Sequence, residues 1–292
     1  MRIFRGRNFL VACLAVLFSS RHCAGEVEKT YETGTVSRLD RAHAHNDYEH
    51  ERPLLDALKH GFVSVEADIH LVKGQLLVAH DRHQVQEHRT LEVLYLNPLQ
   101  TRVKEHGGSV YPEGGGFFLL IDIKSEGEAT YEVLRGLLAE YKDMLTVFGE
   151  KEVREGAVTV VLSGNRPRDM LLAESPRYAG YDGRWGDLDG TDKPSFMPLV
   201  SDNWSLHFTW RGFGEMPAME RDKLRNSVNK AHAQGKKIRF WGTLDIPCPA
   251  REALWRELLE ANVDLINTDD LKGLRLFLLE NESPHLLDRR KK

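Results

Sequence analysis

The chain is poor in cysteine, which excludes two classes of site. Three cysteines occur among 292 residues, and two of them, Cys13 and Cys23, lie close to the N-terminus. Cys248 stands between two prolines, with no other cysteine in the remaining chain. A disulfide framework and a cysteine-based zinc site are therefore excluded, because both need several cysteines.

Basic stripes and long apolar segments are also missing. The net charge is −4, with 41% hydrophobic and 29% charged residues, which excludes disorder, collagen-like repeats and a multi-span membrane protein. Only the terminal tail, 281–292, ends in a basic run, so no nucleic-acid partner is expected, and no protein partner is predicted.

The apolar run Asn8–Phe18 follows three arginines and is too short to span a bilayer as a helix. We interpret residues 1–24 as a signal peptide, which predicts a secreted or periplasmic protein. Its removal would take away four arginines and change the net charge from −4 to −8. An uncleaved anchor and a lipid-modified Cys23 are the alternatives.

Histidine is concentrated in one part of the chain. Eight of the 13 histidines lie in the 46 residues from His43 to His88, where an even spread would place about two. Because the unperturbed pKa of histidine is near neutrality, this segment is where we expect acid–base chemistry.

Short apolar, β-branched runs alternate with segments of helical period. The expected strands are Val36–His43, Phe62–Ile69, Phe117–Lys124, Ala157–Leu162, Tyr178–Tyr181, Met197–Ser201, Lys237–Trp241 and Val263–Asn267. The expected helices are Pro53–Lys59, Leu91–Glu105, Ala129–Leu145, Arg168–Glu174, Met219–Ala233, Arg251–Ala261 and Leu271–Leu279. Eight such units predict a (β/α)8 TIM barrel in one domain, 36–280. A doubly wound sheet is the competitor, but no glycine-rich phosphate turn follows the first strand.

Polar residues end the first three strands, where a barrel has its mouth. Glu66 and Asp68 are two apart and share one face of a strand, and Asp122 ends the next strand. Three neighbouring carboxylates must take up protons or bind a cation, and oxygen ligands suit Mg²⁺ or Ca²⁺. The sequence therefore predicts a divalent-metal site near the first histidines.

Two histidines beside such a site suit phosphodiester chemistry. One could take a proton from the attacking oxygen while the other gives one to the leaving oxygen, and Lys124 could stabilise the negative charge of the transition state.

Motifs in this order resemble a known superfamily. They include His45-Asn-Asp-Tyr48, Val65-Glu-Ala-Asp68, Leu77-Val-Ala-His-Asp81, Ile121-Asp-Ile-Lys124 and Leu265-Ile-Asn-Thr-Asp269. This pattern resembles the phosphatidylinositol-phospholipase-C-like phosphodiesterases, beside the glycerophosphodiester phosphodiesterases and sphingomyelinases D. The likeness is greatest to the branch typified by the altered inheritance of mitochondria protein six.

The resemblance implies His45 and His80 as the catalytic pair and Glu66, Asp68 and Asp122 as metal ligands. We further expect substrate contacts from Asn46, Lys124 and Trp241, whose indole could stack on a quaternary ammonium head group. Asn46 stands where glycerophosphodiesterases have an arginine, Asp122 stands where they have a glutamate, and their glycerol-binding insertion has no room after His80. We therefore predict a metal-dependent hydrolase of a lipid-derived or other small phosphodiester, with peripheral membrane contact as one further expectation.

Two other functions fit parts of this pattern. His43 and His45 could begin a zinc amidohydrolase site, although that site would leave the three carboxylates unexplained, and a barrel could bind a phosphate ester without catalysis. His43 is expected to be packed or to support the site residues rather than to act as a catalyst. His50, His60, His83 and His88 are expected in solvent, and His70 is expected to be a partly exposed strand-end residue. Further candidates for the pocket lining are Arg184, Asp202, Trp204 and Arg239. The last strand-to-helix turn is expected to be closed by Asn267, Asp269 and Asp270, with Asp269 or Asp270 as a helix cap.

Overall fold

The computed structural model describes residues 36–282, which contain eight parallel strands arranged as a barrel. Their order around the sheet is β10-β9-β8-β7-β4-β2-β1-β11, and a parallel bridge between Arg239 and Leu265 brings β10 next to β11. The strands are β1 (Leu39–Ala44), β2 (Phe62–Val72), β4 (Phe117–Ile123), β7 (Val158–Gly164), β8 (Ala179–Gly183), β9 (Leu199–Asn203), β10 (Lys237–Trp241) and β11 (Ile266–Thr268). The predicted (β/α)8 barrel is confirmed.

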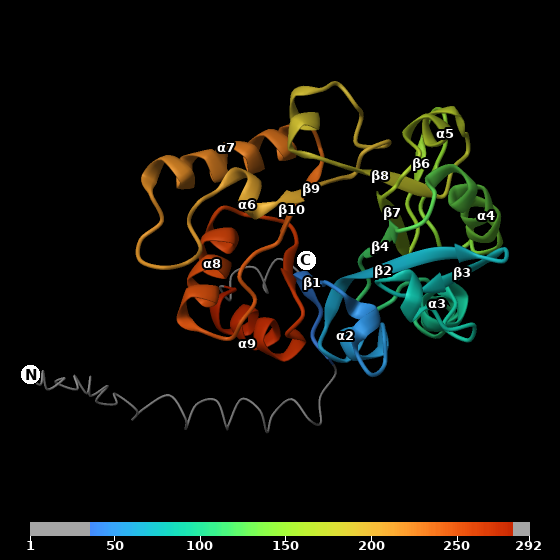
Figure 1. The fold of residues 1–292 in the computed structure, drawn as a ribbon, viewed down its shortest axis with the longest axis horizontal. Coiled ribbons are helices and arrows are strands. Elements are labelled where there is room, and N and C mark those ends of the chain that lie inside the picture. The colour runs from blue at the N-terminus through green and yellow to red at the C-terminus, as the bar shows by residue number, and fades with distance from the viewer. Residues whose placement is uncertain (1–35, 283–292) are drawn as a thin grey trace, which may run out of the picture. The chain divides into compact units, whose positions relative to one another are not determined.

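Helices follow the strands and lie around them (Figure 1). They are α2 (Leu55–Lys59), α3 (Asn97–Glu105), α4 (Gly127–Glu140), α5 (Arg168–Ala173), α6 (Trp204–His207), α7 (Ala218–Ala233), α8 (Pro249–Glu260) and α9 (Leu271–Asn281). A π-helical turn, Glu92–Leu96, leads into α3, and the short 3-10 helices are Asp47–Glu49, Arg82–Gln84 and Trp185–Asp189. Within residues 36–282, no helix is both long and apolar enough to cross a bilayer.

The strands are apolar on both faces because both faces are covered. Alternate residues of β4, such as Leu119 and Ile121, point outward and pack in the large core shared with the helices. The intervening residue Leu120 points inward and packs with Val161, Leu199 and Leu265 from other strands. This apolar plug fills the lower barrel and leaves the polar ends of the strands at the mouth.

A hairpin carries His80 to the mouth. Strand β2 turns back at Lys73 and Gly74 into β3 (Gln75–Val78), pairing Ile69 with Val78. Both turn residues have positive φ, 50° and 80°, as a two-residue hairpin requires. This two-residue hairpin brings the chain back along β2 and delivers His80 beside Asp68.

Element ends differ from the sequence prediction at several places. The helix expected over Ala129–Leu145 runs from Gly127 to Glu140, because Leu145 pairs with Val158 in a parallel bridge. The short strands β5 (Val147–Phe148) and β6 (Val153–Arg154) follow this bridge and were not predicted. The signal-peptide prediction, with Cys13 and Cys23, and the basic end of the tail lie outside the described residues and stay predictions.

Candidate active site

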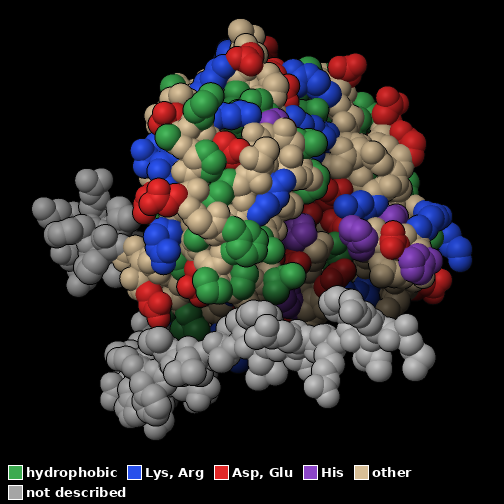
Figure 2. All heavy atoms as spheres, turned by 60° about the vertical axis from the view of Figure 1, so that its left-hand side comes forward, with side chains coloured by type: hydrophobic (Ala, Val, Ile, Leu, Met, Phe, Trp, Pro, Cys, Tyr) green, Lys and Arg blue, Asp and Glu red, His purple; other side chains and the backbone are tan. Residues whose placement is uncertain are grey.

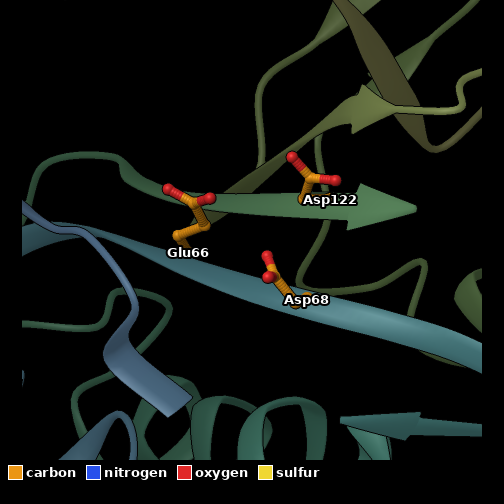
Figure 3. A group of neighbouring side chains, drawn as sticks. All are labelled: Glu66, Asp68 and Asp122. Atoms are coloured by element: carbon orange, nitrogen blue, oxygen red, sulfur yellow. The ribbon is translucent and has the colours of Figure 1, made fainter. Parts of the chain in front are cut away.

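Three carboxylates converge at the mouth of the barrel (Figure 3). Glu66 and Asp68 come from β2, Asp122 comes from β4, and oxygens of all three lie within 4.8 Å of one another. The strand register explains this, since Asp68 pairs with Asp122 across neighbouring parallel strands. Glu66 and Asp68 are buried and Asp122 is half-buried. The structure therefore brings together the three residues predicted as metal ligands.

Burial of the carboxylates changes their pKa values. Burial, with repulsion from Glu66, raises the pKa of Asp68 to about 6, and burial also raises the pKa of Asp122. Burial acts in the same direction on Glu66, but the positive charge of Arg239 outweighs it and lowers the pKa of Glu66 well below its usual range. The charged forms of Asp68 and Asp122 are thus destabilised, chiefly by burial, and a bound cation would relieve this.

The two oxygens of the Asp68 carboxylate have different surroundings. Its Oδ2 lies 2.7 Å from the Tyr48 hydroxyl, 3.0 Å from His80 Nδ1 and 3.0 Å from Lys124 Nζ. Its Oδ1 is buried and has no hydrogen-bond partner among the described residues. A buried carboxylate oxygen without a partner costs free energy. The carboxylate group therefore fits a hard divalent cation, which would bind this oxygen.

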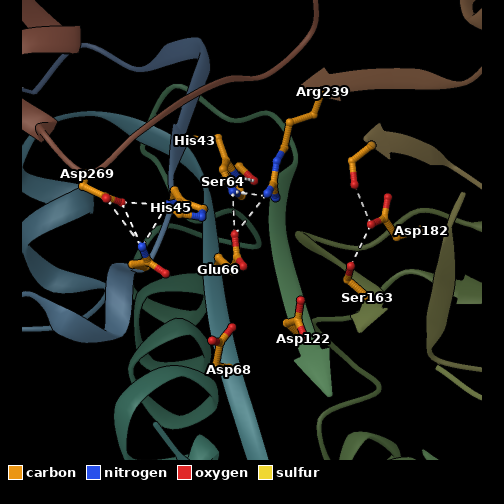
Figure 4. Close-up of polar contacts among 12 residues, drawn as sticks. His43, His45, Ser64, Glu66, Asp68, Asp122, Ser163, Asp182, Arg239 and Asp269 are labelled. Atoms are coloured by element: carbon orange, nitrogen blue, oxygen red, sulfur yellow. Dashed lines mark hydrogen bonds and ion pairs between the residues drawn. The ribbon is translucent and has the colours of Figure 1, made fainter. Parts of the chain in front are cut away.

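His80 and His45 are each oriented by an aspartate through the same ring nitrogen. His45 Nδ1 donates to Asp269 Oδ1 at 2.8 Å (Figure 4). His80 Nδ1 donates to Asp68 Oδ2 at 3.0 Å. Burial opposes protonation of His45, but the hydrogen bond to Asp269 outweighs it and raises the pKa of His45. In both rings Nε2 is left to exchange a proton, as general acid–base catalysis needs.

Asn46 supports the His45 and Asp269 pair. Its amide nitrogen lies 3.3 Å from Asp269 Oδ1, and its Oδ1 lies 2.7 Å from the Tyr48 hydroxyl. Asn46 has φ 47° and ψ 34°, a left-handed conformation that asparagine adopts more readily than most residues. The asparagine therefore fits the tight turn that starts the loop after β1.

His43 lies in a buried layer below the mouth and has no free ring nitrogen. Its Nδ1 is 2.7 Å from Ser64 Oγ, and its Nε2 accepts a hydrogen bond from Arg239 at 2.9 Å. Burial, with the Arg239 charge, lowers the pKa of His43 to about 3. The neutral ring matches the expected packing role, and the zinc site considered for His43 and His45 is disfavoured because both nitrogens of His43 are engaged.

The other predicted residues lie at strand ends. Lys124 Nζ is 3.0 Å from Asp68 and 3.3 Å from Asp122. Trp241 ends β10 and is half-buried, opposite Asn203 of β9. Further around the mouth, Arg184 donates to Asp182, and Asp202 accepts from the Trp185 amide. Trp204 is not a lining residue, since it is fully buried among Phe208 and Phe240.

Three expectations about histidines need correction. His70 was expected to be a partly exposed strand-end residue, but it is buried and its Nε2 contacts the His80 carbonyl at 3.1 Å. His50 and His60 were expected in solvent, but both are half-buried, while His83 and His88 are exposed as predicted. His70 lies inside because it shares the inward face of β2 with Asp68.

Sequence reasoning missed three contacts of the site. Asp269 was assigned to the closing turn, but it orients His45, and the helix cap is Asp270, whose side chain accepts from Gly273. Asn267, the neighbouring residue of β11, is buried. Tyr48 and Arg239 were not assigned to the carboxylates they contact. The aspartate at the end of the last strand was a usable signal, because the last and first strands of a barrel are neighbours.

The loop after β1 is anchored by a buried aspartate with an altered pKa. Asp47 Oδ2 accepts from the Leu54 amide at 2.6 Å and from the Tyr95 hydroxyl at 2.9 Å. Burial raises the pKa of Asp47 to about 7. The folded state therefore binds a proton that the unfolded state releases near its ordinary pKa of 3.8.

This shift predicts how stability depends on pH. Because the pKa of Asp47 is higher in the folded state, the protonated side chain favours the folded state fully at low pH. This contribution to the free energy of unfolding, up to about 4 kcal/mol, is lost between about pH 4 and pH 7. Asp47→Asn should remove this dependence, so the variant gains stability relative to wild type as the pH rises from 5 to 8. Urea unfolding at several pH values would measure it, with exposed Asp222→Asn as the control. Parallel pH curves for wild type and Asp47→Asn would contradict the assignment.

Comparison with known proteins gives matches over most of the chain. Residues 36–182 match the AIM6-like phosphodiesterase domain. The chain is 32% identical to altered inheritance of mitochondria protein 6 from Eremothecium gossypii over 280 residues, covering 84% of this chain and 71% of that protein. The protein of the same name from Lachancea thermotolerans is 30% identical over 282 residues, covering 82% of this chain and 66% of that protein.

A solved structure shares the fold. It is a calcium-dependent phosphoinositol-specific phospholipase C from a Gram-negative bacterium, Pseudomonas sp., with a TM-score of 0.51 and 11% sequence identity. The match covers 78% of this chain and 88% of that chain. At this identity the similarity supports the barrel architecture.

Proposed function

Because the chain belongs to the AIM6-like phosphodiesterase family, we propose that it is a phosphoric diester hydrolase that depends on a divalent metal ion. One observation carries this proposal: two histidines, each oriented by an aspartate, lie at the same mouth as three converging carboxylates. This arrangement supplies a base, an acid and a cation site, the three elements that phosphodiester cleavage needs.

The two histidines differ in what their aspartates can do. Asp269 is half exposed and accepts from His45 and Asn46, so it stabilises the imidazolium that forms when His45 takes a proton. We assign His45 as the general base that deprotonates the attacking oxygen. Asp68 contacts Lys124 and Tyr48 through the same oxygen that orients His80, and it is one of the proposed metal ligands. We assign His80 as the general acid that protonates the leaving oxygen.

The metal ion would be bound by Glu66, Asp68 and Asp122. All donors are carboxylate oxygens, which suit Mg²⁺ or Ca²⁺, and the phospholipase C that shares the fold is calcium-dependent by its name. Such an ion, when bound, supplies positive charge that polarises a phosphoryl oxygen.

The remaining contacts concern the substrate. Lys124 places a second positive charge beside the carboxylates, where a phosphate oxygen would lie. Asn46 presents an amide beside His45, and Trp241 lies at the end of β10, where it could stack against a cationic head group. We propose these three as substrate contacts and a lipid-derived or other small phosphodiester as the substrate.

Hydrolysis of a chromogenic diester, bis(4-nitrophenyl) phosphate, by the full chain tests the proposal. We expect turnover with Mg²⁺ or Ca²⁺ and loss of at least about a hundredfold with a chelator, because the carboxylates then repel an anionic substrate. Activity should return when the metal is added back. Equal activity with and without chelator would contradict metal dependence. Retained binding of a phosphate ester without turnover would favour the alternative of a non-catalytic barrel.

An apolar rim borders the mouth, and we propose that it contacts lipid. It consists of Leu206, Phe213, Met219 and Ile246, which are 70% to 87% exposed and follow β9 and β10 in the chain. Gly212 packs tightly against Ala250, so the two loops that carry Phe213 and Ile246 adjoin. On the face drawn in Figure 2, hydrophobic side chains lie beside histidines and acids. Exposed apolar side chains beside a mouth are typical of an interaction surface.

This rim predicts binding to vesicles of phosphatidylcholine. Phe213→Ser and Ile246→Ser should each weaken binding about fivefold to tenfold, because each loses an apolar side chain that would leave water. Vesicle sedimentation with chelator present measures binding without turnover. Val153→Ser, on the short strand β6 away from the mouth, is the control. Equal sedimentation of all variants would contradict the rim's role.

A further inference from the structure

A buried arginine lies directly below the candidate metal site. Arg239 of β10 is 3% exposed, and its side chain reaches across the barrel interior toward β1 and β2 (Figure 4). Its Nη2 donates to Glu66 Oε2 at 3.2 Å, and its Nη1 donates to His43 Nε2 at 2.9 Å. A guanidinium stays charged at every accessible pH, so Glu66 has a permanent cation beside it.

We propose that Arg239 is the internal counter-ion of the metal site, a positioning residue that stabilises the site without metal and weakens its affinity for the divalent ion. This inference rests on the proposed function, because it concerns the ion which that function requires. The fold itself does not need a charged residue at this position, since apolar side chains such as Leu120 and Leu199 fill another layer of the barrel interior. The role of Arg239 therefore concerns the site.

The charges of the site support this role. Three carboxylates face two cations, Arg239 beside Glu66 and Lys124 beside Asp68 and Asp122. With all groups ionised, the cluster carries one negative charge instead of three. Breaking a buried ion pair by removing one partner leaves an uncompensated charge and strongly destabilises a protein. Arg239 therefore allows the carboxylates to remain together before an ion binds.

The same positive charge opposes the incoming ion. Arg239 lies against Glu66, so it repels any cation bound by that carboxylate, and at short range in a protein such repulsion is substantial. Its position is fixed by His43, which accepts from Nη1 and contacts Ser64 through the other nitrogen. The Arg239 contact occupies Oε2 of Glu66 and leaves the other carboxylate oxygen for the ion. The repulsion from Arg239 therefore lowers the affinity of the site, so that the bound ion can exchange.

Two measurements on the full chain test the counter-ion proposal. They are titration calorimetry with Mn²⁺ and thermal unfolding, the latter carried out once with a chelator and once with Mn²⁺. Arg239→Met should bind Mn²⁺ at least about tenfold more tightly than wild type, since a repelling charge is removed. It should also unfold at a lower temperature in chelator and recover most of that loss in Mn²⁺. Arg239→Lys keeps the charge and should bind within about threefold of wild type.

The control is Arg177→Met, which removes another buried arginine, one that stacks on Phe148 and Phe196 away from the carboxylates. It should lose stability equally with and without Mn²⁺, as a purely structural arginine would. If Arg239→Met does not fold in chelator, Glu66→Gln combined with Arg239→Met should restore folding, because no buried charge is then unbalanced. Failure of this double variant would overturn the proposal.

Unchanged or weaker Mn²⁺ binding by Arg239→Met would also overturn the counter-ion role. Failure of the proposed function has a different signature, which is a wild-type protein that hydrolyses no phosphodiester in Mg²⁺, Ca²⁺ or Mn²⁺. The two results are therefore distinguishable in the same set of preparations.

Discussion

Replacing His45 with alanine is expected to lower kcat for a phosphodiester by about a thousandfold, in the range that general acid–base catalysis supplies. His45 is assigned as the base, and its ring is oriented by Asp269 at 2.8 Å. The fold should be unaffected, because the ring is partly exposed at the mouth and fills no core space. Steady-state hydrolysis of the chromogenic diester at saturating metal would measure the loss.

Two further variants separate catalysis by His45 from a structural role. Asp269→Asn should retain more activity than His45→Ala and should shift the acidic limb of the pH profile to lower pH. The reason is that the hydrogen bond to Asp269 raises the pKa of His45, which must be unprotonated to act as a base. His83→Ala removes an exposed histidine and should change nothing. A His45→Ala enzyme with wild-type kcat would refute the assignment.

Replacing Asp68 with asparagine should be as damaging, because one side chain serves two parts of the site. Its Oδ1 has no hydrogen-bond partner among the described residues and would bind the ion, and its Oδ2 orients His80 and contacts Lys124. We expect a loss of about a thousandfold in kcat/KM, as for removal of a preorganised electrostatic group. Because the loss includes the orientation of His80, excess metal should not restore full activity.

The comparison with Asp122→Asn tests this reasoning. Asp122 contacts Lys124 but neither histidine, so its replacement should weaken metal binding and be largely rescued by raised metal concentration. Activity titrated against Mg²⁺ for both variants measures the difference, and exposed Asp81→Asn beside His80 is the control. Complete rescue of Asp68→Asn by metal would show that the His80 contact does not contribute.

Local patterns predicted most of the architecture. The runs Phe117–Ile121 and Val158–Leu162 are apolar on both faces, which in an alternating chain indicates buried parallel strands, and both are strands of the barrel. The two-residue spacing of Glu66 and Asp68 placed both on one face, as the structure shows (Figure 3). These predictions succeed because strand geometry depends on neighbouring residues.

The contacts missed by sequence reasoning join distant parts of the chain. His45 meets a residue 224 positions away, and Glu66 meets one 173 positions away. No local period reports such pairs. Ion-pair geometry inside a barrel depends on strand order and register, which are set by the closing of the whole sheet.

The sequence by itself determined the barrel and the shared face of the carboxylates, because burial patterns and spacing along single strands define which side chains share a face. The choice of His45 and His80 came from the resemblance of the motifs to a phosphodiesterase family. Only the tertiary structure decided how these groups are charged and oriented. Closure of the barrel places Asp269 beside His45, and it places Arg239 beside Glu66 and His43. Burial opposes protonation of both histidines, but the hydrogen bond to Asp269 outweighs it and raises the pKa of His45, whereas burial and the Arg239 charge lower the pKa of His43 to about 3, although the two residues lie two positions apart.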